Sequence, residues 1–228
     1  MDEIRMRPVA RVRSDFPEKF GIPRQSGLVE QLRSTLVFEP EFRDENALRG
    51  IEQFSHLWLI WQFSANAGAG WSPTVRPPRL GGNLRLGVFA TRSPFRPNPI
   101  GLSCVRLEGV RRDARLGMVL EISGADLMDG TPVLDIKPYI PVADAHPEAS
   151  QGFTRHTRAH ALRVEIPEEL RARVPKDRRE ALEGVLTQDP RPAYQDDPMR
   201  AYALSFAGLR VCFCVDGDLL RVTEIAPL

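Results

Sequence analysis

The chain has 228 residues, of which 42% are hydrophobic and 27% are charged, and its formal net charge is +1. This balance is typical of a soluble globular protein with room for one large domain or two small ones. No global positive field draws the chain onto nucleic acid or membrane, so any nucleic-acid contact must come from a local patch.

The N-terminus, MDEIRMRPVARVRSD, is charged and lacks the apolar core of a signal peptide. The longest apolar run, at 57–63, is too short to span a bilayer. Three cysteines, Cys104, Cys212 and Cys214, cannot form a framework of paired disulfides. Cys212 and Cys214 alternate along one stretch, so we expect them to share a strand face as small buried hydrophobes. These features together favour a cytoplasmic protein in a reducing compartment, without membrane contact.

The first 145 residues are predicted to form mostly strands. Two stretches, 4–14 and 28–39, predict the first two strands, and the strongly apolar stretch at 51–64 predicts a third. Between them, PEFRDENALRG at 40–50 predicts a short helix, with Gly50 in the position just after its end.

A loop rich in glycine and proline follows at 65–83 and leads to a strand-like stretch, LGVFA, at 86–90. The next segment, TRSPFRPNP at 91–99, holds three prolines and two arginines, so it can neither pair in a sheet nor coil into a helix. Such a rigid loop is typical of a site held in place before its ligand arrives, although solvated arginines on a stiff connection are the alternative. The strand after this loop enters a hairpin with its turn near 113–116, and DGTP at 129–132 predicts a turn before another short strand.

Short strands at regular spacing, without helical crossovers, favour a barrel or sandwich over a parallel α/β sheet. A weakly hydrophobic linker at 142–160 precedes one or two short helices at 166–188, broken at Pro175, and three final strands. We therefore expect a mainly β protein, with an N-terminal β-barrel over 1–150 and a smaller C-terminal α+β domain over 151–228.

Several familiar sites are missing from this sequence. His156 and His160 are four residues apart, but TRHTRAH lacks the HExxH glutamate and an obvious third ligand, so no metal is expected. There is no GxSxG motif, and no GxGxxG or GxxxxGK[ST] loop for a nucleotide. What remains is a set of rigid polar loops. If the strands form one barrel, these loops can gather at one end and build a pocket for a charged small molecule, in either an enzyme or a binding module.

Six stretches resemble, in order and spacing, the TrmO (TsaA-like) family: EKFGIPRQSGLV, FSHLWLIW, TVRPPRLGGN, LGVFATRSPFRPNPIGLS, DGTPVLDIKPYIP and QDPRPAY. The resemblance covers nearly the full chain and is strongest over 20–144. It implies a β-barrel enzyme that uses S-adenosylmethionine (SAM) to methylate N6 of threonylcarbamoyladenosine, next to the anticodon of tRNA. It also implies a homodimer with the cofactor pocket near the dimer interface.

The same resemblance implies a cofactor site. Arg92 would bind a polar group such as the methionine carboxylate, Leu102 would pack on an apolar part, and Asp129 would accept from ribose hydroxyls or the α-ammonium. Some relatives carry a polar pair such as His-Gln where this chain has Ser64 and Ala65, so contact there would come from the backbone. The full set is Pro23, Arg24, Gln25, Ser64, Ala65, Arg92, Leu102, Asp129, Gly130, Thr131 and Pro132.

Asp135, Lys137 and Tyr139 alternate along a predicted strand, so they should face one side. As catalytic residues, Asp135 would accept the N6 proton and Lys137 would bind the threonyl carboxylate. The alternative is a structural ion pair at a strand end. Contacts to tRNA are expected from Arg76, Arg79, Arg96, Asn98, Arg191 and Tyr194.

Solvated side chains are the alternative at Arg76 and Arg79. Two other functions stay open from the residues alone. One is a non-catalytic module that senses a nucleotide or SAM. The other is a hydrolase or lyase that acts on a small adenosine compound.

Overall fold

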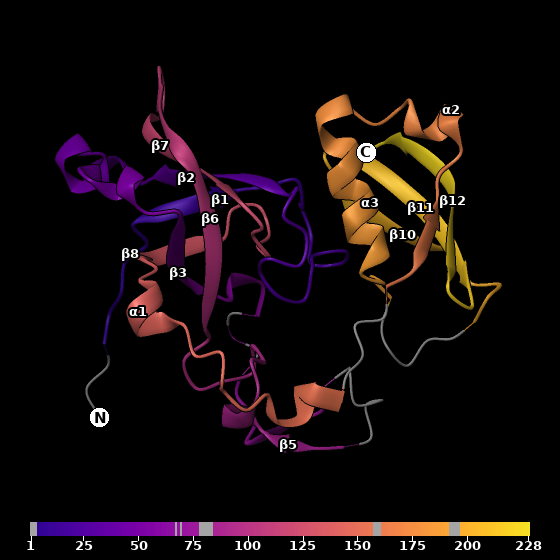
Figure 1. The fold of residues 1–228 in the computed structure, drawn as a ribbon, viewed down its shortest axis with the longest axis horizontal. Coiled ribbons are helices and arrows are strands. Elements are labelled where there is room, and N and C mark those ends of the chain that lie inside the picture. Colours follow the sequence, from indigo (N-terminus) through magenta and orange to yellow (C-terminus); the bar gives the residue numbers. More distant parts are fainter. Residues whose placement is uncertain (1–3, 67, 69, 78–83, 157–160, 192–196) are drawn as a thin grey trace.

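Six strands build the N-terminal half of the protein. The structure, a computed structural model, describes residues 4–66, 68, 70–77, 84–156, 161–191 and 197–228. The six strands are β1 (Ala10–Arg13), β2 (Arg33–Phe38), β3 (His56–Gln62), β6 (Ile100–Asp113), β7 (Gly117–Ser123) and β8 (Pro132–Pro138). They pair in a closed barrel of order β1-β2-β7-β6-β3-β8, in which every pair is antiparallel (Figure 1). The prediction of a mainly β fold is confirmed.

Buried apolar side chains alternate with more exposed residues along the strands, and the buried ones fill the barrel. On β3, Leu57 and Leu59 are fully buried and Trp61 is nearly so, while the residues between them are partly exposed. Leu36 of β2 and Leu120 of β7 join them in one apolar cluster. Burying one such leucine stabilises the fold by about 1.5–3 kcal/mol, so a one-residue slip of register would cost most of the core.

The strand register brings three long connections to the same end of the barrel. The last residue of β3 pairs with the first of β6, the first residue of β2 pairs with the last of β7, and β1 pairs with the first residue of β8. The segments 14–32, 63–99 and 124–131 therefore meet at one end. Most of the residues expected in the cofactor site lie on these three segments.

A second core lies in the C-terminal part of the chain. Its sheet has the order β10-β11-β12-β9, in which β9 runs parallel to β12. One face is covered by α3 (Figure 1), whose buried residues Ala181, Leu182, Val185 and Leu186 form a single helical stripe. The elements are β9 (Arg163–Glu165), α2 (Glu168–Arg171), α3 (Arg179–Thr187), β10 (Tyr202–Phe206), β11 (Leu209–Asp216) and β12 (Leu219–Pro227).

The segment 14–32 packs into this second core, although it precedes the barrel strands β2 to β8. Phe16 is 1% exposed and meets Phe206 edge to face, with ring centroids 5.3 Å apart. Val29 lies against Gly184 of α3 so closely that a Cβ on the glycine would stand 2.7 Å from Val29 Cγ1. The segment thus links the two parts of the protein, which the sequence pattern did not indicate.

Two local predictions were wrong in detail. The helix expected at 40–50 is a pair of 3-10 turns, because the Asp44 side chain accepts from the Asn46 N–H and closes a short turn there. The strand expected at 86–90 has only two strand residues, because Thr91 bonds back to the carbonyl of Val88 and closes a turn. The short elements are η1 (Pro40–Phe42), η2 (Glu45–Leu48), η3 (Ile51–Gln53), β4 (Thr74–Val75), β5 (Leu86–Gly87), η6 (Val88–Ala90), α1 (Pro141–Asp144), η7 (Gly152–His156) and η8 (Lys176–Arg178).

The cysteines of β11 also differ from expectation. Cys212 and Cys214 do share one face, but it is the face turned away from the core, and both are half-buried. Val211, Phe213 and Val215 occupy the inner positions because they are larger and bury more apolar surface. Within the described residues, no helix is long and apolar enough to cross a bilayer.

Candidate cofactor and RNA site

Backbone hydrogen bonds join two of the connections at the barrel end. The Gly27 N–H donates to the carbonyl of Gly124 at 2.8 Å, and the Gly124 N–H donates to the carbonyl of Leu32 at 2.9 Å. The segment that carries Pro23, Arg24 and Gln25 is therefore held against the loop between β7 and β8.

The third connection joins through Arg92. Its guanidinium donates to Oε1 of Gln25, and Gln25 Nε2 donates to the Arg24 carbonyl at 2.5 Å. Arg92 is exposed, which leaves its guanidinium open to an anion from solvent. Two sequence-predicted cofactor residues, 67 positions apart, thus come into direct contact.

Arg96, the second arginine of the proline-rich loop at 91–99, stabilises that loop. Arg96 donates from one terminal nitrogen to the carbonyls of Thr91 at 2.9 Å and Ser93 at 3.4 Å, and its guanidinium lies 6.0 Å from the Phe89 ring centroid. Asn98 accepts a bond from the Ile100 N–H through its own carbonyl, while its side chain is exposed. Arg96 therefore supports the loop, and this support presets the place of Arg92.

The DGTP turn closes the same end of the barrel. Asp129 accepts from the Ser14 N–H at 3.1 Å, and Gly130 adopts a φ of 76°, which favours glycine. Thr131 is 4% exposed and donates to the Met128 carbonyl, so it and the buried Pro132 hold the turn. Asp129 and Gly130 are exposed, beside a cleft of about 270 Å³ that Arg11, Arg13 and Arg43 also line.

Two further cofactor positions lie on β3 and β6. Ser64 and Ala65 begin the turn η4 (Ser64–Asn66), directly after β3. Leu102 points outward from β6 opposite Ile60, and its side chain is 52% exposed. Ile100, on the same strand, is also exposed, at 39%.

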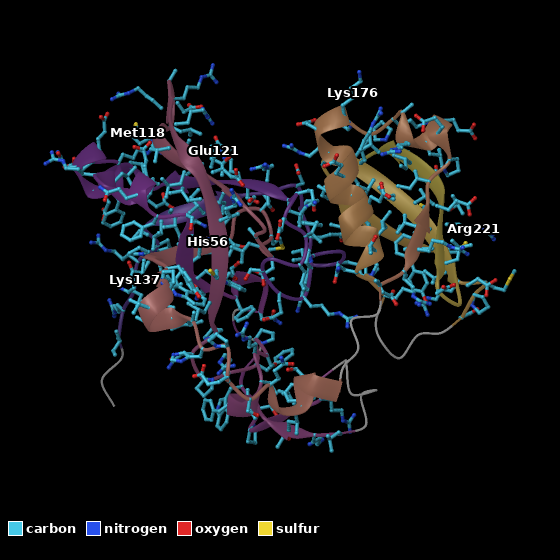
Figure 2. All side chains as sticks on the ribbon, viewed as in Figure 1. His56, Met118, Glu121, Lys137, Lys176 and Arg221 are labelled. Carbon is cyan, nitrogen blue, oxygen red and sulfur yellow. The ribbon has the colours of Figure 1, made fainter. Side chains whose placement is uncertain are left out.

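The three expected catalytic residues share the outer face of the barrel. Ile136 packs on the barrel core, so its neighbours Asp135 and Lys137 point outward. Lys137 Nζ lies 2.9 Å from Asp135 Oδ2, so the ion pair that the sequence left as an alternative is formed. The Tyr139 ring packs on Trp58, with centroids 5.7 Å apart. Figure 2 labels Lys137 on the barrel, while Lys176 and Arg221 lie on the second unit.

The expected RNA contacts are only partly available. Arg76 is exposed, whereas Arg79 and Tyr194 lie outside the described residues. Arg191 is 6% exposed and forms a two-point ion pair with Asp189, at 2.9 and 3.0 Å. Its carbonyl accepts from Arg24 at 3.2 Å. The prediction that Arg191 meets RNA at the surface does not fit this burial, because its charge is already compensated inside the protein.

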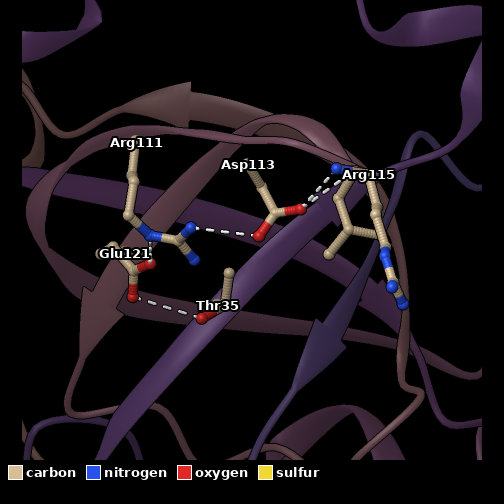
Figure 3. A network of polar contacts seen from close by, with 6 residues as sticks. Thr35, Arg111, Asp113, Arg115 and Glu121 are labelled. Atoms are coloured by element: carbon tan, nitrogen blue, oxygen red, sulfur yellow. Dashed lines mark hydrogen bonds and ion pairs between the residues drawn. The ribbon is translucent and has the colours of Figure 1, made fainter.

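Arg111 of the β6–β7 hairpin is also paired with acidic side chains. Arg111 bonds Glu121 at 2.8 Å and Asp113 at 3.2 Å, and Thr35 donates to Glu121 (Figure 3). The backbone N–H groups of Arg115 and Leu116 are the main reason that the pKa of Asp113 is lowered. This hairpin is therefore a paired charge network rather than a bare basic patch.

One acidic residue at the site was missed in the sequence. Asp126 follows β7, is half-buried, and accepts a hydrogen bond from the Ser103 hydroxyl at 2.6 Å. Burial raises the pKa of Asp126, while the Ser103 hydrogen bond and the Arg92 charge act against that rise. Asp126 lies outside the DGTP motif that singled out Asp129, so no sequence signal marked it. Among the described residues, no group of three or more metal-ligating side chains gathers at this end or elsewhere.

Comparisons of sequence and of structure both relate this chain to the TrmO family. The family profile described as the tRNA-methyltransferase O N-terminal domain matches residues 11–145, and the TrmO C-terminal domain matches 159–228. The tRNA (adenine(37)-N6)-methyltransferase of Escherichia coli (strain K12) is 43% identical over 237 residues, which is 100% of each chain. A putative S-adenosylmethionine-dependent methyltransferase, RcsF of Pseudomonas aeruginosa, is 45% identical over 228 residues, which is 96% of each chain. A crystal structure of TrmO from Pseudomonas aeruginosa superposes with a TM-score of 0.81 at 38% identity, covering 100% of this chain and 99% of that one.

Proposed function

The chain belongs to the TrmO family, and on this premise we propose that it is a SAM-dependent methyltransferase of tRNA. The proposed reaction adds a methyl group to N6 of threonylcarbamoyladenosine, the modified base at adenosine 37, next to the anticodon. The observation that carries the proposal is the contact of Arg92 with Gln25 at the barrel end. That contact brings together two residues that the family resemblance assigns to one cofactor.

The residues at this end fit SAM in chemical type. The exposed Arg92 guanidinium suits the methionine carboxylate, the exposed Leu102 suits an apolar part, and the Asp129 carboxylate suits ribose hydroxyls or the α-ammonium. When bound, SAM supplies a sulfonium whose methyl group is electrophilic. The protein's own task is to hold N6 of the base in line with that methyl carbon and to exclude competing orientations.

The outer face of β8 supplies the proposed proton chemistry. Asp135 accepts the N6 proton, and Lys137 binds the threonyl carboxylate of the substrate. The ion pair places a carboxylate and a cation side by side on one face, as the catalytic role and the structural alternative both require, and the Asp135→Asn variant separates the two. The base has to leave the stack of the anticodon loop to reach them.

We further propose a cytoplasmic homodimer with two domains, 1–150 and 151–228. Exposed apolar side chains on the barrel part support the dimer, since a second copy that covered them would bury Leu102 at the cofactor site. These side chains are Trp71, Phe89, Ile100 and Leu102. The exposed Arg76 is the proposed phosphate contact, and we expect the affinity for tRNA to fall as salt rises.

A methyl-transfer assay tests the function. Purified protein is incubated with methyl-labelled SAM and tRNA from cells that lack the gene, and the labelled nucleosides are analysed. We expect label in N6-methyl-threonylcarbamoyladenosine, lost in Arg92→Ala and retained in Arg112→Ala, an arginine on the β6–β7 hairpin. SAM binding without labelled RNA would instead indicate a binding module. Breakdown of SAM without RNA would indicate a hydrolase or lyase.

A further inference from the structure

The end of helix α3 faces the proposed cofactor segment 23–25. After α3, Asp189 adopts the left-handed conformation, with a φ of 50°, and its carboxylate folds back onto Arg191. Asp189 Oδ1 accepts from Arg191 Nε at 2.9 Å, and Oδ2 accepts from Arg191 Nη2 at 3.0 Å. Asp189 Oδ1 also accepts from the backbone N–H of Arg191 at 3.3 Å. The carboxylate therefore holds both the side chain and the backbone of Arg191.

This ion pair is largely removed from water. The side chains of Arg191 and Asp189 are 7% and 16% exposed. A left-handed position just after a helix is most often occupied by glycine, because a Cβ is unfavourable there. Aspartate at this position supplies the carboxylate that a buried guanidinium requires. The pair is thus part of the packed end of α3 and not a solvated surface charge.

A chain of hydrogen bonds runs from this pair to the proline-rich loop. The Arg191 carbonyl accepts from Arg24 Nη2 at 3.2 Å, across 167 positions of the sequence. The Arg24 carbonyl accepts from Gln25 Nε2 at 2.5 Å, and Gln25 Oε1 accepts from the Arg92 guanidinium. The C-terminal unit is therefore bonded directly to the segment that carries two proposed cofactor residues.

The two segments also meet across a small cavity. Pro23 and Arg24 line it on one side, and Gln188, Asp189 and Pro190 line it on the other. Its volume of about 40 Å³ has room for a few water molecules but not for a ligand of the size of SAM. The contact therefore supports the cofactor segment and is not itself a site for SAM.

We propose that Asp189 and Arg191 are positioning residues of the cofactor site: their ion pair holds the Arg191 carbonyl where it fixes Arg24, and through Arg24 the segment that receives SAM. This inference rests on the proposed function and deepens it, because it gives the C-terminal unit a part in cofactor binding. Neither residue is assigned a contact with SAM or with the reacting atoms.

The physical reason is preorganisation. The segment 14–32 is a long connection without strand or helix, and such a chain has many accessible conformations unless other contacts restrict it. A ligand that has to order its own binding segment binds more weakly by the entropy lost in that ordering. A hydrogen bond to a buried, rigidly held carbonyl removes part of this loss before SAM arrives.

The test measures SAM affinity by isothermal titration calorimetry on the full chain. Asp189→Asn/Arg191→Met removes both charges together, so neither partner is left as an uncompensated buried charge. We expect this double variant to bind SAM about tenfold more weakly, as for the loss of one hydrogen bond from a charged donor. In an Arg24→Met background, the same two substitutions should weaken binding no further, because the pair acts through Arg24. An equal extra loss in that background would overturn the inference.

The matched control is Asp15→Asn/Arg178→Met. Arg178 Nε lies 2.7 Å from Asp15 Oδ2, and this pair also joins the second core to segment 14–32, but earlier in the segment than Arg24. We expect the control to bind SAM as the wild type does. An equal loss of affinity in the control would mean that any loosening between the two parts weakens SAM binding, and it would overturn the specific role of Asp189 and Arg191.

A role of Arg191 in RNA binding gives a different result. The Asp189→Asn/Arg191→Met variant would then show a raised KM for tRNA and an unchanged affinity for SAM, which overturns the inference. Unchanged values of both would leave the ion pair as a structural support of α3, and this outcome overturns the inference as well.

Two outcomes separate this inference from the proposed function. A wild-type protein that does not bind SAM overturns both. A wild-type protein that binds SAM and methylates tRNA, with a double variant of equal SAM affinity, overturns only the inference. If the double variant fails to fold, Arg191→Lys keeps the charge and loses the two-point geometry. We expect that variant to bind SAM severalfold more weakly, and an unchanged affinity overturns the inference.

Discussion

The guanidinium of Arg92 donates a hydrogen bond to the side-chain oxygen of Gln25, across 67 positions of the sequence. This bond joins the proline-rich loop to the segment between β1 and β2. Both ends of the bond are side chains that the family resemblance assigned to the cofactor. Substituting each of the two residues in turn can therefore show which of them binds the cofactor and which one holds its partner in place.

Arg92→Lys should lose most of the SAM affinity, although it keeps the positive charge. A lysine offers a point charge where the guanidinium offers a planar fork for a carboxylate and a second N–H for Gln25. Gln25→Ala should give a smaller loss, because the arginine stays but is less well held. Titration calorimetry on both variants checks this order. If Gln25→Ala bound SAM more weakly than Arg92→Lys does, the roles proposed for the two residues would be reversed.

Asp126→Asn should not destabilise the fold at neutral pH. Burial raises the pKa of Asp126, so the folded state binds its proton more readily than the unfolded state does. The ionised carboxylate therefore opposes folding at pH values above its raised pKa, and that cost disappears as the pH falls through it. Urea denaturation at pH 7 should show an unchanged or higher free energy of unfolding. A large loss of stability would mean that the ionised form supports the fold.

Removing Arg178 should destabilise the protein. Arg178 Nε lies 2.7 Å from Asp15 Oδ2, with side-chain exposures of 28% and 16%. Burial raises the pKa of Asp15, and Arg178 opposes that rise. Arg178→Met would leave a partly buried carboxylate without its cation, at a cost of about 1–3 kcal/mol. The cost should shrink towards acid pH, as Asp15 takes up a proton. Denaturation of Arg178→Met and of Arg178→Met/Asp15→Asn checks this, since the double variant should recover stability.

Gly184→Ala should loosen the contact between α3 and the segment 14–32. A Cβ there would stand 2.7 Å from Val29 Cγ1, so one of the two elements must shift, at a cost of about 1–3 kcal/mol. Val29→Ala removes the clashing methyl group. The double variant should therefore lose less free energy of unfolding than the sum of the losses in the two single variants. Thermal unfolding of the three variants provides the comparison. Strict additivity would contradict direct contact at this position.

Asp135→Asn should reduce methyl transfer about 10²–10⁴-fold while it leaves SAM binding unchanged. The reason is that the proposed role of Asp135 is to accept a proton from the base, on the outer face beside Lys137. Single-turnover assays with labelled SAM separate the chemical step from binding. Full turnover in this variant would leave Asp135 and Lys137 as a structural ion pair.

Some features followed from local chemistry that the sequence displays directly. The β6–β7 hairpin turns where it was expected, because Asp113 accepts from the N–H groups of Arg115 and Leu116, two and three residues away. The final three strands and the break before α3 were likewise predicted from alternation and from Pro175. Gly50 adopts the expected left-handed conformation at φ 88°.

Other features depended on contacts that no short stretch encodes. The sequence around Arg191 predicted an exposed arginine. In the structure Arg191 is buried, where it pairs with Asp189 and its carbonyl accepts a hydrogen bond from Arg24. Cys212 and Cys214 alternate as strand residues should, but only the packing of larger neighbours decided which face turned inward.

The sequence alone determined that this protein is mainly β and that it has rigid polar loops. It also contains the motifs that place it in a family. These properties depend on the alternation, turn chemistry and composition of neighbouring residues. Only the tertiary structure decided that segment 14–32 joins the second core, that Arg92 meets Gln25, and that Asp126 accepts a hydrogen bond from Ser103. The reason is that burial and electrostatic pairing are set by residues distant in the chain, which the strand register brings to one end of the barrel.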